Sequence, residues 1–349
     1  MRLQLFKYKL PAGLIKQYPP EKRSDAKLMV VHKDTGEIEH RKFSDIIDYI
    51  DENDVLVAND SYMLNSLIYG EKQHSSVPIS IFLLKEVDKN NNIWNIESNP
   101  ARKVRVGNKI IFRDLDMVGE IIDNTSSNGR MMKFITDKNS DQINEDIIKK
   151  GQIKLPKYIK RTPTEKDLIY TKSIFAKTKG SVNHVFSSLH FDEKLLLKMQ
   201  LKGIDIETIT YHINNFPMNK FDTKTISNNM KTPEFYNIQK ETANVITKKK
   251  AEGAKIFAVG YSTLMGLENS FNSTLNSFVT SDSIAIKTSF SRKNFNICNG
   301  YLTNFHESGS LYLIIDAAFC GEELLDHAYK EAIKNEYNFL LFGDSLLII

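Results

Sequence analysis

The sequence predicts an α/β main domain that carries an inserted small all-β domain of the barrel type. The chain has 349 residues, which is long enough for two domains. Short runs rich in β-branched residues follow one another from about residue 77 to residue 136, and helix-like and strand-like segments alternate after them. We therefore expect the main domain at residues 1–74 and 151–349 and the inserted barrel at residues 75–150.

Short elements precede the predicted insertion. The stretch "LPAGLIKQYPP" has prolines near both ends, which predicts a short helix. The stretch "KLMVVHKDTGEIEHRKF" predicts two strands joined by a turn at Asp34-Thr35-Gly36. The apolar run in "DVLVAND" predicts a strand that ends at Asn59 and Asp60.

The predicted insertion consists of strands separated by turn-forming residues. The turn formers are Asn90-Asn91-Asn92, Gly107-Asn108 and Asn128-Gly129. The five strand-like runs are "ISIFLL", "IWNIES", "NKIIF", "VGEIID" and "RMMKFI". Consecutive short strands of this kind are typical of a small barrel or sandwich.

The last part of the chain alternates between helices and strands. "DEKLLLKMQLKG" predicts a helix that Asp192 caps and Gly203 ends. The further helices are "KETANVITKKKAEG" and "LLDHAYKEAIKN", and the strands are "IETITYHI", "KIFAVG" and "SLLII". This alternation predicts an α/β core whose strand ends form a cleft.

The composition is that of an ordinary globular protein. The formal net charge of +4 is too small to indicate nucleic-acid binding by itself. The two cysteines, Cys298 and Cys320, form neither a disulfide framework nor a metal-binding spacing. The N-terminal segment lacks the pattern of a signal peptide, and the apolar stretch "LYLIIDAAF" is too short to span a membrane. We expect a cytoplasmic protein.

Four side chains suited to acid–base chemistry lie where predicted elements end. Asp60 follows the strand "DVLVAN", and His190, His212 and His306 lie at three other element boundaries. Histidine titrates near neutral pH, so we interpret these four residues as candidate catalytic groups around one cleft. Alternatively, each histidine caps an element or makes a local hydrogen bond. Their spacing does not indicate a metal site.

Two further features indicate anion binding. A strand ends at Gly260 in "AVGYSTLMGLEN", and a helix start there would present free N–H groups to a phosphate or a carboxylate, although a plain turn has the same pattern. The basic stretch "KKGQIKLPKYIKR" predicts RNA contacts by Lys157, Tyr158, Lys160 and Arg161, because cations around an aromatic ring suit phosphates and bases. The alternative is a solvated linker.

An ordered set of short motifs resembles one enzyme family over nearly the whole chain. The motifs are "LPAGLIKQYP", "TGEIEH", "DVLVAND", "PARKVRVG", "GRMMKF", "LPKYIKR", "SLHF", "ITYH", "FAVG", "LTNFH" and "FGDSLLI". The chain is similar to the S-adenosylmethionine:tRNA ribosyltransferase-isomerases of queuosine synthesis.

The resemblance implies a fold, a reaction and two substrates. It implies an α/β domain with an inserted barrel, S-adenosylmethionine as co-substrate, and the anticodon stem-loop of tRNA as partner. The ribosyl part of S-adenosylmethionine would move to the 7-aminomethyl-7-deazaguanine base and rearrange to epoxyqueuosine, while adenine and methionine leave and no metal takes part. With this resemblance we assign substrate binding to Asn59, Gly260, Glu268, Asn304 and Asp344.

Several positions depart from the family pattern, and most of them lie at strand ends. Where the family has Thr, Arg, Pro and Arg, this chain has Ser61, Tyr62, Asn65 and Leu67. Further departures are Ser80, Val185, Phe186, Ser187, Asn229, Tyr261, Ser262, Met265 and the segment 308–311. We expect the apolar and aromatic replacements, which are Tyr62, Leu67, Phe186, Phe216, Tyr261 and Met265, to fill part of the cleft.

Three functional hypotheses stay open on the sequence. The chain performs the family's tRNA reaction, or it is an inactive paralogue that binds or scaffolds, or it acts on a different small molecule. The lost cations predict weak binding of S-adenosylmethionine, whereas Asp60, the three histidines and Asp344 are retained.

Overall fold

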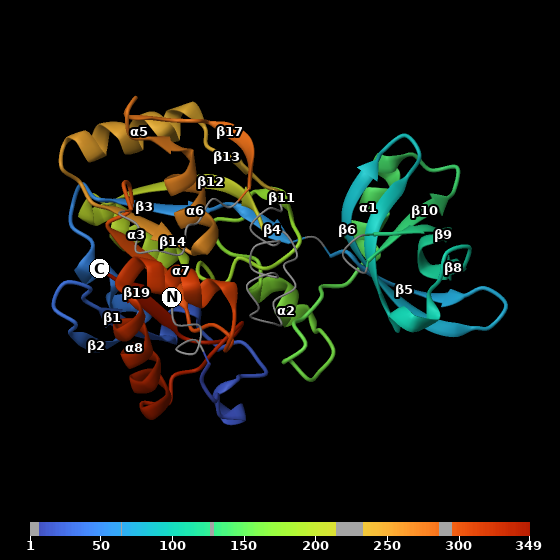
Figure 1. Ribbon diagram of the computed structural model, residues 1–349, viewed down its shortest axis with the longest axis horizontal. Coiled ribbons are helices and arrows are strands. Elements are labelled where there is room, and N and C mark those ends of the chain that lie inside the picture. Colours follow the sequence, from blue (N-terminus) through green and yellow to red (C-terminus); the bar gives the residue numbers. More distant parts are fainter. Residues whose placement is uncertain (1–6, 64, 126–128, 214–232, 286–294) are drawn as a thin grey trace. The chain divides into compact units, whose positions relative to one another are not determined.

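The computed structural model describes residues 7–63, 65–125, 129–213, 233–285 and 295–349, in two compact units. The main unit comprises Met1–Met63, Tyr158–Lys160 and Ile169–Ile349. The barrel unit comprises Leu64–Lys157 and Arg161–Leu168. The predicted fold class, an α/β domain with an inserted barrel, is confirmed (Figure 1).

The main unit is built on a mixed sheet. Among the described residues nine strands join it, in the order β17-β13-β12-β3-β14-β18-β19-β1-β2. Their bounds are β1 Lys27–Val31, β2 Ile38–Lys42, β3 Val55–Asn59, β12 Asp205–His212, β13 Pro233–Asn237, β14 Ile256–Val259, β17 Ser281–Ala285, β18 Gly300–Asn304 and β19 Ser345–Ile348. Strands β12, β3, β14 and β18 run parallel to their neighbours within this group. The predicted hairpin is the antiparallel pair of β1 and β2.

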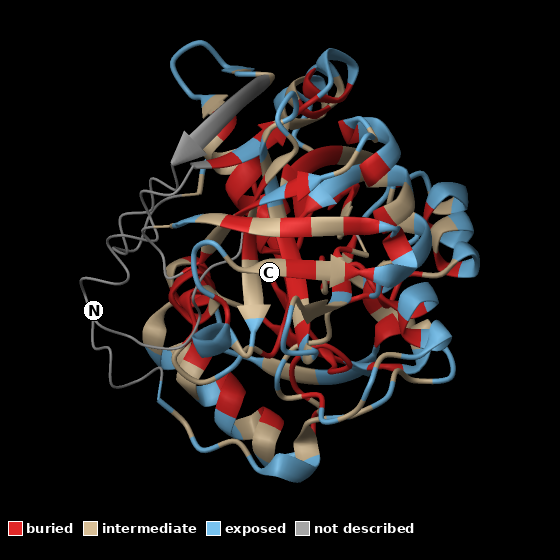
Figure 2. Ribbon diagram, turned by 90° about the vertical axis from the view of Figure 1, so that its right-hand side faces the viewer, coloured by how far each residue is buried: buried red, intermediate tan, exposed pale blue. Residues whose placement is uncertain are grey.

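Helices cover both faces of the sheet and bury its apolar side chains in two separate cores. One core contains side chains of α5, α6, α7 and α8, and the other contains side chains of α3 and of the 3-10 helix η4. The strands β1, β3, β14, β18 and β19 are buried along most of their length, whereas outer helix faces and loops are exposed (Figure 2). The bounds are α3 Glu193–Lys202, α5 Lys240–Ala251, α6 Tyr261–Ser270, α7 Leu311–Cys320, α8 Glu322–Lys334 and η4 Phe43–Tyr49.

Local signals explain where these helices begin and end. The Asp192 side chain accepts a 2.8 Å hydrogen bond from the Leu195 N–H, which caps α3. Gly203 ends the same helix in a left-handed conformation with φ 90°, which favours glycine. The predicted helices in "KETANVITKKKAEG" and "LLDHAYKEAIKN" are α5 and α8.

The barrel unit contains a closed barrel of six strands in the order β10-β7-β6-β5-β8-β9. The bounds are β5 Leu67–Lys72, β6 Val77–Asp88, β7 Ile93–Asn99, β8 Lys109–Phe112, β9 Met117–Asn124 and β10 Arg130–Ile135. Five of these strands are those that the sequence predicts. Inward side chains such as Ile81, Trp94 and Phe112 fill the interior, together with Ile143 and Ile147 of helix α1 (Ser140–Lys150).

The sequence analysis did not predict two elements of the barrel unit. Strand β5 lies before the predicted insertion start at residue 75, and Gly70 interrupts its apolar pattern. A Cβ at Gly70 would lie 2.8 Å from the Phe112 ring, so glycine permits the close approach of β5 and β8. Helix α1 follows a capping box of Asn139 and Gln142, a signal that the sequence does contain.

The remaining elements are short. They are the strands β4 Ser61–Met63, β11 Thr178–Ser181, β15 Phe271–Asn272 and β16 Ser277–Phe278, the helix α2 Glu165–Tyr170, and the 3-10 helices η2 Ala12–Leu14, η3 Arg23–Asp25, η5 Ala101–Lys103 and η6 Arg113–Leu115. The predicted short helix in "LPAGLIKQYPP" is η2. No helix within the described ranges has the length and apolar character needed to cross a membrane.

Candidate active site

The sheet places several predicted site residues along one edge. The carboxyl ends of the parallel strands β12, β3, β14 and β18 share that edge, and β19 begins there because it runs antiparallel to β18. Asn59, Asp60, His212 and Gly260 lie at the ends of the first three strands. Asn304 and Asp344 lie at the end of β18 and the start of β19. Strand ends of this kind are where α/β proteins commonly bind ligands.

Asp60 is held by two threonine hydroxyl groups. Thr210 donates a 2.7 Å hydrogen bond to Asp60 Oδ1, and Thr178 donates a 3.3 Å bond to Oδ2. The Asp60 residue is 9% exposed. Neither threonine was predicted as a site residue from the sequence, although Thr210 lies two residues before His212 on the same strand. A nearly buried carboxylate in a fixed orientation can stabilise positive charge.

His212 is the centre of a second group of hydrogen bonds. Its Nδ1 lies 2.7 Å from Ser61 Oγ, which lies 2.8 Å from Ser181 Oγ. Ser181 Oγ accepts a 3.1 Å bond from the Ile213 N–H. The His212 ring also stacks on Phe235, with 5.3 Å between ring centroids. These contacts fix the plane of the imidazole ring and give Nδ1 a hydroxyl partner.

Burial lowers the pKa of His212 below its ordinary value of 6.5, and the nearby charge of Asp60 only partly opposes this effect. His212 is therefore neutral at pH 7. If Nδ1–H donates to Ser61, then Nε2 keeps a free lone pair and can accept a proton. A Cβ at Gly180 would lie 2.5 Å from His212 Nε2, so only glycine lets the backbone approach the imidazole ring this closely.

Asn59 has a positioning role, which corrects the prediction that it binds substrate. Its Nδ2 donates 2.8 Å bonds to the Tyr211 carbonyl and to Ser262 Oγ. Its Oδ1 accepts bonds from the N–H groups of Ser61, at 2.9 Å, and Tyr211, at 3.0 Å. All four hydrogen-bonding positions of the amide are thus used within the protein. Asn59 ties β3 to β12 and α6 and so orients Asp60.

Gly260 begins helix α6 with φ 86°, a conformation that favours glycine. A Cβ there would lie 3.3 Å from Ser187 Cβ, so the segment that precedes His190 approaches this helix start closely. The predicted anion site at the Gly260 turn has the expected strand-to-helix geometry.

Asn304 and Asp344 are joined at the same edge. The Asn304 amide donates a 3.3 Å bond to the Asp344 carbonyl. The Asp344 carboxylate accepts 2.7 Å bonds from the N–H groups of Lys27 and Asn338. Burial raises the pKa of Asp344, although these donors oppose the shift. The Asp344 side chain therefore braces the starts of β1 and β19.

The hydrogen bonds and ring contacts of His190 and His306 involve neither Asp60 nor His212. His190 is 1% exposed, its Nδ1 lies 3.2 Å from the Arg23 carbonyl, and its ring lies 5.2 Å from that of Phe43. Burial lowers the pKa of His190 to about 4 and that of His306 to about 3. Both rings are neutral at pH 7, and we assign them to the folded core near the edge.

His306 belongs to a buried polar cluster around Asp316 of α7. Its Nε2 lies 2.9 Å from Thr303 Oγ1 and 3.5 Å from Asp316 Oδ2. Asp316 is fully buried, and among the described residues neither carboxyl oxygen has a partner with hydrogen-bond geometry. Burial raises the pKa of Asp316 well above its ordinary value of 3.8, while Tyr301 and Thr303 oppose this shift. Burial therefore favours the protonated, uncharged form of Asp316 in the folded protein.

Replacing Asp316 by asparagine is expected to stabilise the protein increasingly as pH rises. The unfolded chain releases the Asp316 proton above about pH 4, whereas the folded chain keeps it, so the wild type loses stability as pH rises through this range. The Asp316→Asn variant lacks this loss, so its stability relative to wild type should be greater at pH 8 than at pH 4, by about 1.4 kcal/mol for each pH unit by which burial raises the Asp316 pKa. Calorimetric unfolding at both pH values measures the gain, with the exposed Asp48→Asn change as control. A gain independent of pH would contradict the assignment.

Glu268 lies away from this edge, so the structure does not bring it together with the other residues predicted to bind substrate. Helix α6 starts at the edge and carries Glu268 towards the opposite end of the sheet, beside the segment that precedes β18. Its carboxylate accepts bonds of 2.7, 2.9 and 2.8 Å from the N–H groups of Asn296, Ile297 and Cys298. The Glu268 carboxylate therefore stabilises the backbone of residues 296–298.

Two members of the predicted RNA-binding stretch make contacts within the protein. Tyr158 packs against the hydrophobic core of the main unit, and burial raises its pKa. Arg161 forms two 2.6 Å hydrogen bonds with the buried carboxylate of Asp167. Lys157 and Lys160 are exposed.

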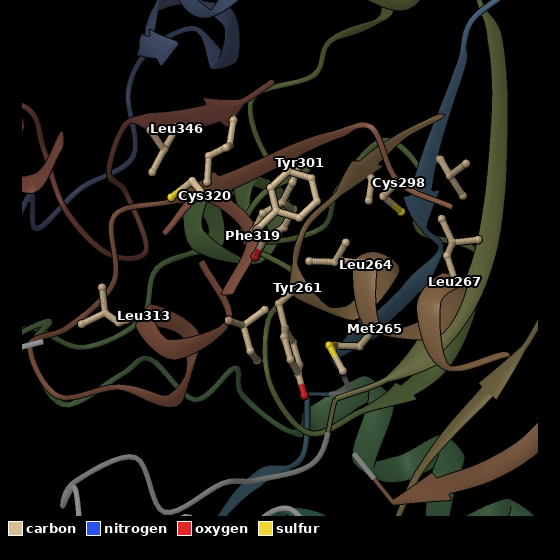
Figure 3. Packing of buried hydrophobic residues seen from close by; sticks show 14 of the residues in the cluster. Tyr261, Leu264, Met265, Leu267, Cys298, Tyr301, Leu313, Phe319, Cys320 and Leu346 are labelled. Atoms are coloured by element: carbon tan, nitrogen blue, oxygen red, sulfur yellow. The ribbon is translucent and has the colours of Figure 1, made fainter. Parts of the chain in front are cut away.

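Two of the replacements relative to the family pattern are buried in the main core. Tyr261 is 5% exposed and Met265 is 2% exposed, and they project from α6 into the same cluster (Figure 3). Tyr261 donates a 3.2 Å bond to the buried Glu234. Tyr62 and Phe186 are half-buried, and Leu67 belongs to the barrel. Phe216 and Asn229, two further positions that depart from the family pattern, lie outside the described residues.

A cavity of about 210 Å³ in the main unit is lined in part by Tyr8 and Tyr329, whose hydroxyl groups hydrogen-bond the backbone of His306. Its lining includes Lys7, Tyr8, Glu322, Asp326 and Lys330. Among the described residues, no group of three or more histidine, cysteine, aspartate or glutamate side chains could hold a metal ion.

Comparisons with known proteins agree with this architecture. Residues 3–348 match the family described as "Queuosine biosynthesis protein". The chain belongs to this family. It is 38% identical to the S-adenosylmethionine:tRNA ribosyltransferase-isomerase of Amoebophilus asiaticus and 37% identical to that of Cytophaga hutchinsonii, and each alignment covers 100% of both chains.

A solved structure shares the fold. The crystal structure of S-adenosylmethionine tRNA ribosyltransferase from Thermotoga maritima matches with a TM-score of 0.53 and 28% sequence identity, and it covers 99% of this chain and 100% of the other. The resemblance inferred from the ordered motifs is confirmed, as is the family's combination of an α/β unit with a barrel. The named relatives are transferase-isomerases of tRNA modification.

Proposed function

We propose that this protein is an S-adenosylmethionine:tRNA ribosyltransferase-isomerase. It transfers the ribosyl part of S-adenosylmethionine to 7-aminomethyl-7-deazaguanine in the anticodon stem-loop of tRNA, and rearranges it to epoxyqueuosine. The observation that carries the proposal is the neutral His212 beside Asp60 at the end of β12. Relatives that match over their full length have this activity in their names. The proposed reaction takes place in the cytoplasm, where tRNA is modified.

The two side chains suit the first demands of this reaction. A base must remove a proton from the carbon beside the sulfonium, and His212 Nε2 can accept it when Nδ1–H donates to Ser61. The Ser61 hydroxyl then donates to Ser181 Oγ, which keeps the pair satisfied. As the imidazole becomes charged, the nearby carboxylate of Asp60 stabilises the positive charge.

The proton taken by His212 also has a use later in the reaction. Departing adenine needs an acid, and protonated His212 can return the proton to a leaving nitrogen. The aminomethyl nitrogen of the tRNA base forms the new bond to the ribosyl carbon, and adenine and methionine are the groups released. Gly260 and Asn304 lie at the same edge and are the proposed binding groups for the co-substrate.

One observation favours a second candidate function, an inactive or repurposed family member that binds RNA or scaffolds. The buried Tyr261 and Met265 replace polar and cationic residues of the family pattern and occupy interior volume beside the edge. An arginine lost from a carboxylate or phosphate contact is not replaced by a thioether. This candidate predicts weak or absent binding of S-adenosylmethionine.

Product release separates the two candidates. The protein is incubated with S-adenosylmethionine and with tRNA that carries 7-aminomethyl-7-deazaguanine, and free adenine and methionine are quantified. The proposed function predicts equal amounts of both products, only when this tRNA is present. Absence of both, together with no heat of S-adenosylmethionine binding in calorimetry, would support the second candidate.

A further inference from the structure

We propose that Lys172, Lys177 and Lys179, together with Tyr62, form an RNA-binding surface that holds the tRNA loop next to the candidate active site. This surface is called the lysine strip below. The inference rests on the proposed function, because it names where the main unit contacts the same tRNA. The lysine strip differs from the stretch 149–161, in which the sequence predicts RNA contacts.

The backbone directs these side chains to one surface. Strands β4 and β11 pair in parallel, with Lys179 opposite Tyr62 and Thr178 opposite Ser61. Side chains alternate between the two faces of a strand. The Thr178 and Ser61 hydroxyl groups bond Asp60 and His212 on one face. Lys177, Lys179 and Tyr62 therefore project from the other face.

The surface combines cations with an aromatic ring. The Lys172 Nζ lies 4.8 Å from the centre of the Tyr62 ring, which places the third lysine beside the other two. All three lysines are exposed, and Tyr62 is half-buried. The sequence contains no acidic residue from Leu168 to Phe191. Among the described residues these lysines form no ion pair with a carboxylate, so their charge is available to an anion.

The lysine strip is continuous with the candidate active site. The N–H groups of Lys177 and Thr178 donate bonds of 2.8 and 3.0 Å to the Asp60 carbonyl. Lys177 and Lys179 thus directly flank Thr178, whose hydroxyl holds the Asp60 carboxylate. An RNA loop whose phosphate binds Lys177 or Lys179 would fold over the β4–β11 strand pair to bring a neighbouring base to Asp60 and His212 on its other face.

RNA fits this surface better than a purely anionic partner does. Phosphates in a looped strand are spaced to meet successive lysines, and unpaired bases stack on tyrosine rings. A negatively charged lipid surface would use the cations and would not need the flat ring. The stretch 149–161 offers fewer side chains to RNA, because Tyr158 packs against the core and Arg161 forms an ion pair with Asp167.

The test compares tRNA binding by two charge-matched triple variants. Lys172, Lys177 and Lys179 are changed to alanine in one, and the exposed Lys194, Lys198 and Lys248 of α3 and α5 in the other. Gel-shift titrations use a tRNA transcript at 50 and 200 mM salt, with duplex DNA of equal length as a competitor. Circular dichroism checks that both variants are folded.

The lysine-strip variant should bind tRNA at least tenfold more weakly than wild type at low salt, and its log–log salt slope should be smaller by about 2. The control triple variant should bind like wild type. Changing Tyr62 to alanine should weaken binding about fivefold or more, whereas Tyr62→Phe should keep most of the affinity.

Three outcomes would overturn the proposal. If wild type binds tRNA and the lysine-strip variant binds equally well, the surface is wrong and the proposed function stands. If both triple variants bind tRNA more weakly than wild type to the same degree, the surface is not an RNA site. The same conclusion follows if duplex DNA competes for binding as well as tRNA does. If wild type does not bind tRNA at all, the proposed function fails, and the inference fails with it.

Discussion

Replacing His212 by glutamine is expected to lower the rate of product formation by about 10²- to 10⁴-fold. General-base catalysis contributes a factor of this size, and glutamine cannot accept a proton near neutral pH. Glutamine can still bond Ser61, so the fold around β12 should persist. Single-turnover release of adenine from S-adenosylmethionine, with modified tRNA in excess, measures the effect.

The exposed His327 of α8 supplies the matched control, because His327→Gln makes the same chemical change away from the sheet edge. This variant should retain wild-type rates. A rate for His212→Gln within threefold of wild type would show that His212 is not the base.

The pH profile gives a second readout of the same residue. Burial lowers the pKa of His212 below 6.5, so its neutral form dominates at pH 7. We therefore expect kcat/KM to be level between pH 7 and 8 and to fall as pH drops through the His212 pKa, below 6.5. The acid limb should disappear from the residual activity of His212→Gln.

Replacing Arg161 by alanine is expected to destabilise the barrel unit by about 3–5 kcal/mol. The change removes two 2.6 Å hydrogen bonds and leaves the fully buried carboxylate of Asp167 without its cation. Thr164 still donates to that carboxylate, through its N–H at 2.7 Å and its hydroxyl at 2.8 Å. Trp94, the single tryptophan, is buried in the barrel, so its fluorescence reports urea unfolding of this unit.

The loss should depend on pH in a defined direction. Burial alone would raise the pKa of Asp167, but Arg161 and Thr164 outweigh it and hold the pKa below its ordinary value of 3.8. The stabilisation is therefore complete above about pH 4 and is lost as pH falls through the depressed pKa. Lys160→Ala, one residue away and exposed, should change stability by less than about 0.5 kcal/mol. Equal effects of the two changes would contradict this account.

Most of the fold could be predicted because its signals are local. Asp192 and Gly203 delimit α3, and the turn at residues 34–36 joins β1 to β2. Alternating apolar residues were sufficient for five barrel strands. Strand β5 was not predicted, because Gly70 interrupts its apolar run and is explained only by the approach of β8.

The candidate site could be predicted only in part, since tertiary contacts decide which polar side chains remain available. Asp60 and His212 lie where apolar strands end, and that rule identified them. The sequence alone does not distinguish Arg161 from its neighbouring lysines, because only the fold brings Asp167 against it. Thr164 and Asp167 do form a capping pattern that could have indicated this contact. Glu268 was misplaced because its distance from the edge depends on the direction of α6.

Nucleoside analysis of the reacted tRNA tests the central claim most directly. Transcripts carrying 7-aminomethyl-7-deazaguanine are incubated with S-adenosylmethionine and this protein, digested to nucleosides and analysed by mass spectrometry. The account predicts that the 7-aminomethyl-7-deazaguanosine is converted to epoxyqueuosine, and that His212→Gln at equal concentration leaves it unconverted over the same time. Unchanged nucleoside with the folded wild-type protein, under conditions in which a related enzyme such as that of Cytophaga hutchinsonii converts it, would contradict the account.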